Sequence, residues 1–128
     1  PAAGPSPGSV RQRFGHRLAI GTSAHDLDEL GRAEPEGADF VTYGPVYPPG
    51  SKGGSASIVG IEGLRSAVKS TALPVFALGG ITPERVLGCR EAGASGVAVV
   101  SGILGAEDVG GAVRSYVGAW EQRPIDPG

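Results

Sequence analysis

The chain has 128 residues with 11 basic and 13 acidic side chains, a net charge of −2, and one cysteine, Cys89. This length suffices for one domain with its own core, and the lack of a basic block argues against nucleic acid as a partner. No apolar run approaches the roughly 20 residues of a membrane span, and a lone cysteine is typical of a reducing compartment, so we predict a soluble cytoplasmic domain.

Both ends of the chain are predicted to be irregular. Residues 1–9 are rich in proline and glycine, and residues 122–128 are expected to fray, which leaves residues 10–121 as the folded domain. The stretch VRQRFG, residues 10–15, is typical of the end of a helix. Residues 17–23, RLAIGTS, form a short apolar run that ends in glycine and serine, which predicts a buried strand.

A helix and a second strand are predicted next. The apolar positions of residues 25–38 recur at helical spacing and predict one buried helix face, made of Leu27, Leu30 and Ala33. Asp26 is expected to cap this helix, with Glu29 three residues later. Pro35 is expected to end the helix because its ring cannot continue the hydrogen-bond pattern. Residues 39–47, DFVTYGPVY, then predict a strand.

The second half of the chain repeats this alternation. Helices are predicted over residues 61–72, 82–94 and 106–120, and strands over residues 74–80 and 96–103. Thr82 and Pro83 supply a helix start signal, because threonine caps free amides and proline needs no N–H at the first helical position. Residues 96–103 are a continuous apolar run, which is typical of a strand covered on both faces.

This alternation predicts the fold class. Strands that alternate with helices form parallel βα units with right-handed connections. We count about four such units, which is half of the eight-stranded TIM or (β/α)8 barrel. The predicted fold is therefore α/β, a TIM-barrel-type half barrel of four parallel βα units.

Two glycine-containing strand ends are the leading candidates for a ligand site. In parallel α/β proteins, ligands bind beyond the carboxyl ends of the strands. Gly79 and Gly80 permit close approach of the backbone, and the helix after them offers unpaired N–H groups and a positive dipole end, which favour phosphate. Val100, Ser101 and Gly102 follow the last strand and can act in the same way. The alternative is that these glycines only shape the turns.

Four further polar residues are candidates. Ser51 and Lys52 lie in a loop rich in glycine and proline, where a cation suits phosphate capture, although a solvated surface lysine explains the same pattern. Ser23 and His25 end the first strand, and a histidine there can transfer protons near neutral pH or merely join a polar helix cap. Cys89 lies at apolar spacing in a helix and is interpreted as core. No metal site is predicted.

Three stretches carry a resemblance to a known family. They are IGTSAHDLDELGRAEPEGADFVTYGPVYPPGSK, ALGGITPERV and AGASGVAVVSGI. In order and spacing they resemble the second half of the thiamine phosphate synthase/TenI superfamily. The resemblance implies a TIM barrel that binds a thiazole phosphate. In the synthase, this thiazole is joined to an aminopyrimidine pyrophosphate, and pyrophosphate is released.

The resemblance also implies roles for individual residues. The positions that match pyrophosphate-binding residues are Ser23, Ser51 and Lys52. The positions that match the residues holding the thiazole phosphate are Gly80, Val100 and Ser101. His25 matches the proton-transfer histidine of the TenI-type thiazole tautomerases, so that activity is an alternative to the synthase. A third possibility is a phosphate-binding remnant or interaction module without turnover.

The chain departs from the family pattern in two places. The synthase loop usually reads Pro-Thr-x-Thr-Lys, whereas residues 48–52 read Pro-Pro-Gly-Ser-Lys, and the second proline removes a hydroxyl and an N–H. The family's first strands, which carry the aspartates that hold Mg²⁺, have no counterpart. A half barrel leaves two edge strands and one sheet face uncovered. We therefore expect a homo-oligomer, or pairing with an N-terminal half, in place of a stable monomer.

Overall fold

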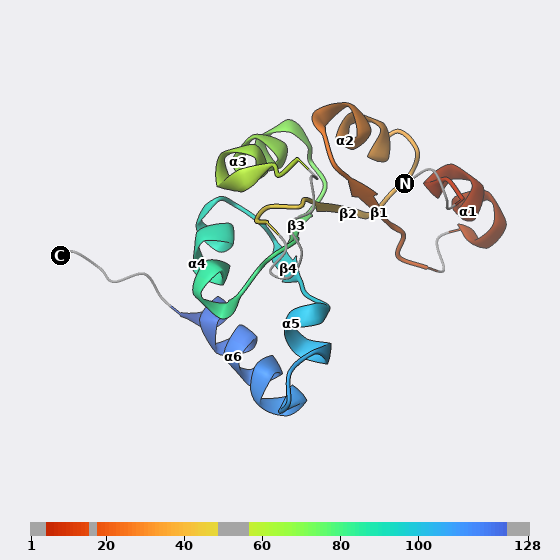
Figure 1. The fold of residues 1–128 in the computed structure, drawn as a ribbon. Helices are drawn as coiled ribbons and strands as arrows, with labels where there is room; N and C mark the ends of the chain where they lie inside the picture. Colours follow the sequence, from red (N-terminus) through yellow and green to blue (C-terminus); the bar gives the residue numbers. More distant parts are fainter. Residues whose placement is uncertain (1–4, 16–17, 49–56, 123–128) are drawn as a thin grey trace.

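The structure is a computed structural model, and it describes residues 5–15, 18–48 and 57–122. It contains one parallel sheet of four strands in the order β1-β2-β3-β4, so that each strand pairs with the next one along the chain (Figure 1). The strands are β1 (Gly21–Ala24), β2 (Phe40–Tyr43), β3 (Val75–Leu78) and β4 (Gly96–Ala98). The predicted half barrel of parallel βα units is therefore confirmed.

Helices separate the strands. They are α1 (Pro7–Phe14), α2 (Leu27–Ala33), α3 (Gly60–Ser70), α4 (Pro83–Glu91), α5 (Ser101–Leu104) and α6 (Val109–Glu121). In Figure 1, α2, α3, α4 and α6 form an arc along one side of the sheet, and α1 lies beyond β1. The sheet is thus covered by helices on one side only, as in one half of a barrel wall.

The first helix corrects the prediction for the start of the chain. The sequence predicts irregular structure over residues 1–9, whereas α1 begins at Pro7. The physical reason is a local start signal: the Ser6 side chain accepts a hydrogen bond from the Ser9 N–H at 3.2 Å, and proline occupies the first helical position, where it needs no N–H.

The two faces of the sheet differ in burial. Five side chains on the helix side are buried almost completely: Ala24, Val41, Tyr43, Val75 and Ala77. The side chains that alternate with them, including Phe40 and Phe76, are half-buried. These two rings meet edge to face with their centroids 5.5 Å apart, and each lies over a glycine of the neighbouring strand, Gly21 and Gly96, where a Cβ atom would collide with it. This second face corresponds to the interior of a barrel.

The last predicted strand is shorter than its apolar run. The sequence predicts a strand over residues 96–103, covered on both faces, but β4 ends at Ala98 and α5 begins at Ser101. The N–H groups of Ile103 and Leu104 both donate to the Val100 carbonyl, at 3.2 and 2.8 Å, which closes a helical turn. β4 is also an edge strand, so its residues are only half-buried.

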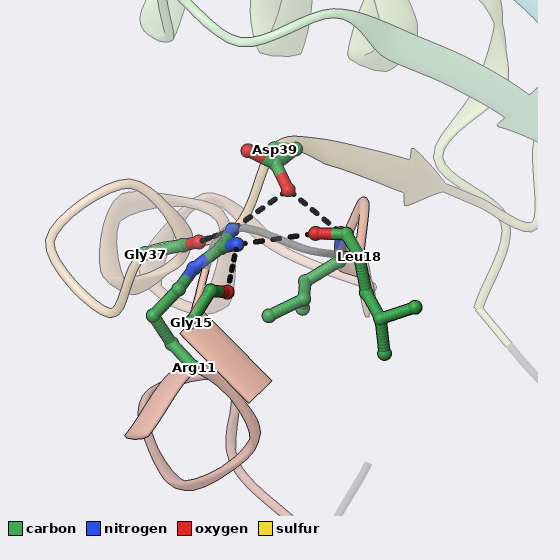
Figure 2. Close-up of polar contacts among 6 residues, drawn as sticks. Arg11, Gly15, Leu18, Gly37 and Asp39 are labelled. Carbon is green, nitrogen blue, oxygen red and sulfur yellow. Dashed lines mark hydrogen bonds and ion pairs between the residues drawn. The ribbon is translucent and has the colours of Figure 1, made fainter. Parts of the chain in front are cut away.

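A polar cluster around Arg11 fixes α1 to the amino ends of β1 and β2 (Figure 2). The guanidinium donates to three carbonyls and one carboxylate at 2.7–3.1 Å, those of Gly15, Leu18, Gly37 and Asp39. The Asp39 carboxylate also accepts the Ile20 N–H at 2.7 Å. The Arg11 side chain is only 17% exposed, so this cluster joins three segments of the chain at the edge of the core.

None of the helices in the described residues is long and apolar enough to cross a membrane.

Candidate functional site

The turn after β3 requires its two glycines. Gly79 and Gly80 have φ values of +104° and +63°, which side chains disfavour. The segment that follows β2 also packs directly on this turn: the Tyr47 N–H donates to the Gly79 carbonyl at 3.1 Å, and a Cβ atom at Gly80 would lie 2.7 Å from the Tyr47 carbonyl oxygen. The glycines therefore let two loops at the carboxyl end of the sheet approach each other closely.

The amino end of α4 is already occupied by the chain's own groups. Pro83 has no N–H, and the Arg85 N–H donates to the Thr82 carbonyl at 2.9 Å. The Glu84 carboxylate is hydrogen-bonded by its own backbone N–H and by the Thr82 side chain, which lowers the pKa of that carboxyl. The sequence predicts that this helix start offers free amides to a ligand, but Pro83 has no N–H and the Arg85 N–H is already bonded to the Thr82 carbonyl.

The turn after β4 leaves its amides available. Val100 precedes α5, and Ser101 and Gly102 are its first residues, so their N–H groups have no acceptor within the helix. A Cβ atom at Gly102 would collide with the Tyr116 hydroxyl. That hydroxyl donates to the Ile81 carbonyl at 2.7 Å. Tyr116 on α6 therefore connects the turn after β4 with the turn after β3.

The two turns enclose a cavity of about 280 Å³. Its lining includes every residue of the predicted phosphate site: Gly79, Gly80, Val100, Ser101 and Gly102. Thr82, Arg85 and Tyr116 complete its polar wall. The structure thus brings together residues from two strand ends that are about 20 positions apart in the sequence. Their role in binding phosphate stays a prediction.

Arg85 is the residue that sequence reasoning missed. Its Nη1 donates to the Gly80 carbonyl at 2.7 Å, and its guanidinium carbon lies 4.4 Å from the centroid of the Tyr47 ring. Of the described residues that line the cavity, it alone carries a charge. The sequence does contain a signal. Arg85 is the third residue of a helix, where the positive end of the helix dipole disfavours a cation, and an arginine at such a position indicates a role other than helix stability.

The other predicted residues lie elsewhere. The Ser23 hydroxyl, at the carboxyl end of β1, hydrogen-bonds the Thr42 hydroxyl at 2.9 Å. The Nδ1 of His25 is 3.2 Å from a Glu29 carboxylate oxygen, which also accepts the His25 backbone N–H at 2.8 Å. Neither Ser23 nor His25 lines the cavity. His25 therefore takes part in the polar start of α2. Ser51 and Lys52 lie outside the described residues.

Cys89 belongs to the core. Its side chain has no exposed surface, and burial raises the pKa of the thiol to about 11. A buried thiol with a raised pKa is a poor nucleophile because the thiolate is the reactive form. The interpretation of Cys89 as a core residue agrees with this position.

Comparison with known proteins identifies the family. The family model described as thiamine monophosphate synthase matches residues 5–103. The chain belongs to this family. The thiamine-phosphate synthase of Moorella thermoacetica is 40% identical to it over 105 residues, which are 82% of this chain and 50% of that protein. The thiamine-phosphate synthase of Methanococcus maripaludis is 44% identical over 103 residues, which are 80% of this chain and 49% of that protein.

A solved structure supports the same assignment. Thiamine phosphate pyrophosphorylase from Pyrococcus furiosus superimposes with a TM-score of 0.79 at 36% identity, and the match covers 90% of this chain and 55% of that one. The chain thus spans about half the length of the synthases it matches. The resemblance of its strand-end motifs to the thiamine phosphate synthase/TenI superfamily is confirmed.

The described residues contain no cluster of side-chain ligands for the Mg²⁺ ion that the synthase resemblance implies. Oxygen ligands, chiefly carboxylates, are what Mg²⁺ requires. In the described ranges, no three residues of the types His, Cys, Asp and Glu lie close enough together to hold a metal ion.

Proposed function

We propose that this chain serves a thiamine phosphate synthase-type transferase and supplies the site for the thiazole phosphate. The reaction joins this thiazole to an aminopyrimidine pyrophosphate and releases pyrophosphate. The single observation that carries the proposal is the cavity, because it is lined by both glycine-containing turns at the carboxyl end of the sheet. Family membership supports the choice of ligand.

In this proposal, the phosphate group is held by the backbone. The N–H groups of Ser101 and Gly102 have no acceptor within α5, and such groups bind phosphate oxygens well. The Ser101 hydroxyl adds a further donor. Gly79 and Gly80 form the opposite wall, where the lack of side chains leaves room for the ligand. Fixing the phosphate in this way orients the thiazole for reaction.

The pyrophosphate is assigned to the other predicted residues. Ser23 lies at the carboxyl end of β1, the same end of the sheet as the cavity. We assign to it, with Ser51 and Lys52, the neutralisation of charge on the leaving pyrophosphate. No contact of His25 favours the tautomerase alternative, because its ring is paired with Glu29 at the start of α2.

We further propose that the half barrel is completed by a second copy of the chain or by an N-terminal half. β1 and β4 are both edge strands, and exposed strand edges promote association. Light scattering tests this directly: a monodisperse monomer contradicts it. We also assign the protein to the cytoplasm, where a lone thiol such as Cys89 stays reduced.

The proposed function is tested in two steps. Calorimetric titration of the chain with thiazole phosphate is expected to show binding, and binding of the unphosphorylated thiazole alcohol is expected to be much weaker. Release of pyrophosphate is then measured with both substrates and with each one alone. Release that requires both substrates supports the synthase. A chain that binds neither form of the thiazole contradicts the proposal, and binding without release points to the remnant.

A further inference from the structure

We propose that Arg85 supplies the positive charge of the phosphate site and, through the Gly80 carbonyl, positions the turn that forms its wall. This inference rests on the proposed function, since it takes the ligand of the cavity to be a phosphate ester. It places a cation from α4 at the thiazole phosphate, whereas Lys52 is assigned to the pyrophosphate.

The guanidinium is held in a fixed orientation at the cavity. Nη1 donates to the Gly80 carbonyl at 2.7 Å, and the planar group lies over the Tyr47 ring at 4.4 Å from its centroid. Arginine carries five N–H donors. Within the described part of the chain, Nε and Nη2 have no hydrogen-bond acceptor. Arg85 therefore keeps donors for a ligand while its contacts with Gly80 and Tyr47 hold it in place.

The cavity needs such a charge. A doubly charged ester that leaves water requires compensation, and the amides of Ser101 and Gly102 carry only partial charges. At the start of α4, Pro83 has no N–H and the Arg85 N–H donates to the Thr82 carbonyl. The nearby Glu84 carboxylate is exposed, does not line the cavity, and bonds its own backbone N–H and Thr82. A charge-assisted hydrogen bond from Arg85 supplies what the backbone lacks.

A second arginine on the same helix shows what a purely structural role looks like. Arg90 donates from Nη1 to the carbonyls of Trp120 and Gln122 at 3.0 and 2.9 Å, and its guanidinium carbon lies 5.8 Å from the Trp120 ring centroid. It lies in the last turn of α4, where the helix dipole favours a cation, and it does not line the cavity. Arg90 is therefore a matched control.

The experiment compares Arg85→Gln, Arg85→Lys and Arg90→Gln with the unmodified chain. Calorimetric titrations with thiazole phosphate, the thiazole alcohol and inorganic phosphate give the affinities. Arg85→Gln is expected to weaken thiazole phosphate binding about 10- to 100-fold, the size of one charge-assisted hydrogen bond. Its affinity for the alcohol is expected to stay within about twofold. Arg85→Lys recovers part of the loss, and Arg90→Gln changes neither affinity.

The pH profile adds a readout that a structural role does not move. The second ionisation of a phosphate monoester lies near pH 6, so binding to the unmodified chain strengthens as the pH rises from about 5 to about 7. This rise is expected to be smaller in Arg85→Gln. An unchanged affinity for thiazole phosphate in Arg85→Gln overturns the inference. An equal loss of affinity for thiazole phosphate and for the thiazole alcohol overturns it as well.

The proposed function fails separately from this inference. If the unmodified chain binds inorganic phosphate in an Arg85-dependent way but has no affinity for thiazole phosphate, the proposed function is wrong and the role of Arg85 stands. If the chain binds neither probe, both are wrong. Thermal unfolding of each variant shows whether it is folded, and Arg85→Lys keeps the test valid if Arg85→Gln unfolds.

Discussion

Two arginines at opposite ends of the sheet hold backbone carbonyls in different ways. At the amino end, Arg11 donates to four acceptors, which are three backbone carbonyls and the Asp39 carboxylate (Figure 2). At the carboxyl end, Arg85 donates to the single carbonyl of Gly80 and stacks on the Tyr47 ring. The first guanidinium makes four hydrogen bonds within the chain, and the second makes one and keeps donors beside a cavity.

This difference matches the division of roles in barrels of parallel strands. The amino end of the strands serves stability, and the carboxyl end carries the site. A group whose hydrogen bonds are made within the chain stabilises the fold, because unfolding breaks these bonds. A group with spare donors at a cavity is available to a ligand. Substitutions at the two ends of the sheet test whether stability and binding separate in this way.

The largest expected effect on stability is at Arg11. Arg11→Ala removes four hydrogen bonds, three to backbone carbonyls and one to the Asp39 carboxylate, so we expect the free energy of unfolding to fall by about 2–3 kcal/mol. Urea unfolding measures this. Arg13→Ala on the same helix removes only a contact 5.7 Å above the Phe14 ring and is expected to cost less than about 1 kcal/mol. Equal losses in both variants contradict the account.

A change at Gly80 is expected to affect both stability and binding. Gly80→Ala places a side chain at φ +63° and against the Tyr47 carbonyl, so we expect a loss of about 2 kcal/mol in the free energy of unfolding and weaker thiazole phosphate binding. Gly31→Ala in α2 is the control: apart from its chain neighbours and the backbone of its own helix, no atom of the described residues lies within 4 Å of the added Cβ, and alanine favours a helix by up to about 1 kcal/mol. If Gly80→Ala changes neither the free energy of unfolding nor the binding of thiazole phosphate, the close packing of this turn against the segment after β2 is contradicted.

A smaller effect is expected at Tyr116. Tyr116→Phe removes the hydroxyl that donates to the Ile81 carbonyl at 2.7 Å, so the free energy of unfolding is expected to fall by about 1 kcal/mol and the two turns to loosen. Ser115→Ala removes a hydroxyl that bonds within α6, to the Gly111 carbonyl, and is expected to leave binding unchanged. If Ser115→Ala weakens binding as much as Tyr116→Phe, the connection through Tyr116 is unimportant.

The smallest effect on the free energy of unfolding at neutral pH is expected at Cys89, which lies in the core and not at either end of the sheet. Its folded-state pKa of about 11 exceeds the ordinary value of 9.0, so the unfolded chain releases this proton at lower pH than the folded chain. The stability is therefore fully present below about pH 9 and declines as the pH approaches about 11. Cys89→Ala is expected to remove this part of the alkaline decline in urea unfolding. An identical pH dependence in both chains contradicts the burial of the thiol.

Local signals made much of the fold predictable. Asp26 caps α2 by accepting the Glu29 N–H at 2.8 Å, as the spacing of the two residues predicts. The alternation of apolar runs correctly predicts four parallel strands. The start of α1 was missed although its serine and proline carry a signal of the same kind, because the surrounding proline and glycine content favoured irregular structure.

The site was predictable only in part because its contacts are not local. The glycines and Ser101 stand at strand ends, where the topology alone brings them together. The helix α5 was not predicted, since the packing of Gly102 against Tyr116 joins residues 14 positions apart. Arg85 was missed for the same reason: its contact with the Tyr47 ring comes from a segment that precedes α3 in the chain.

The central claim, that the two glycine-containing turns and Arg85 form one phosphate site, is tested most directly by a crystal structure of the chain with thiazole phosphate. We predict the phosphate group within hydrogen-bond distance of the Ser101 and Gly102 N–H groups and the Arg85 guanidinium. A phosphate bound at the Arg11 end of the sheet, or bound at the carboxyl end without contact to either turn, contradicts the account.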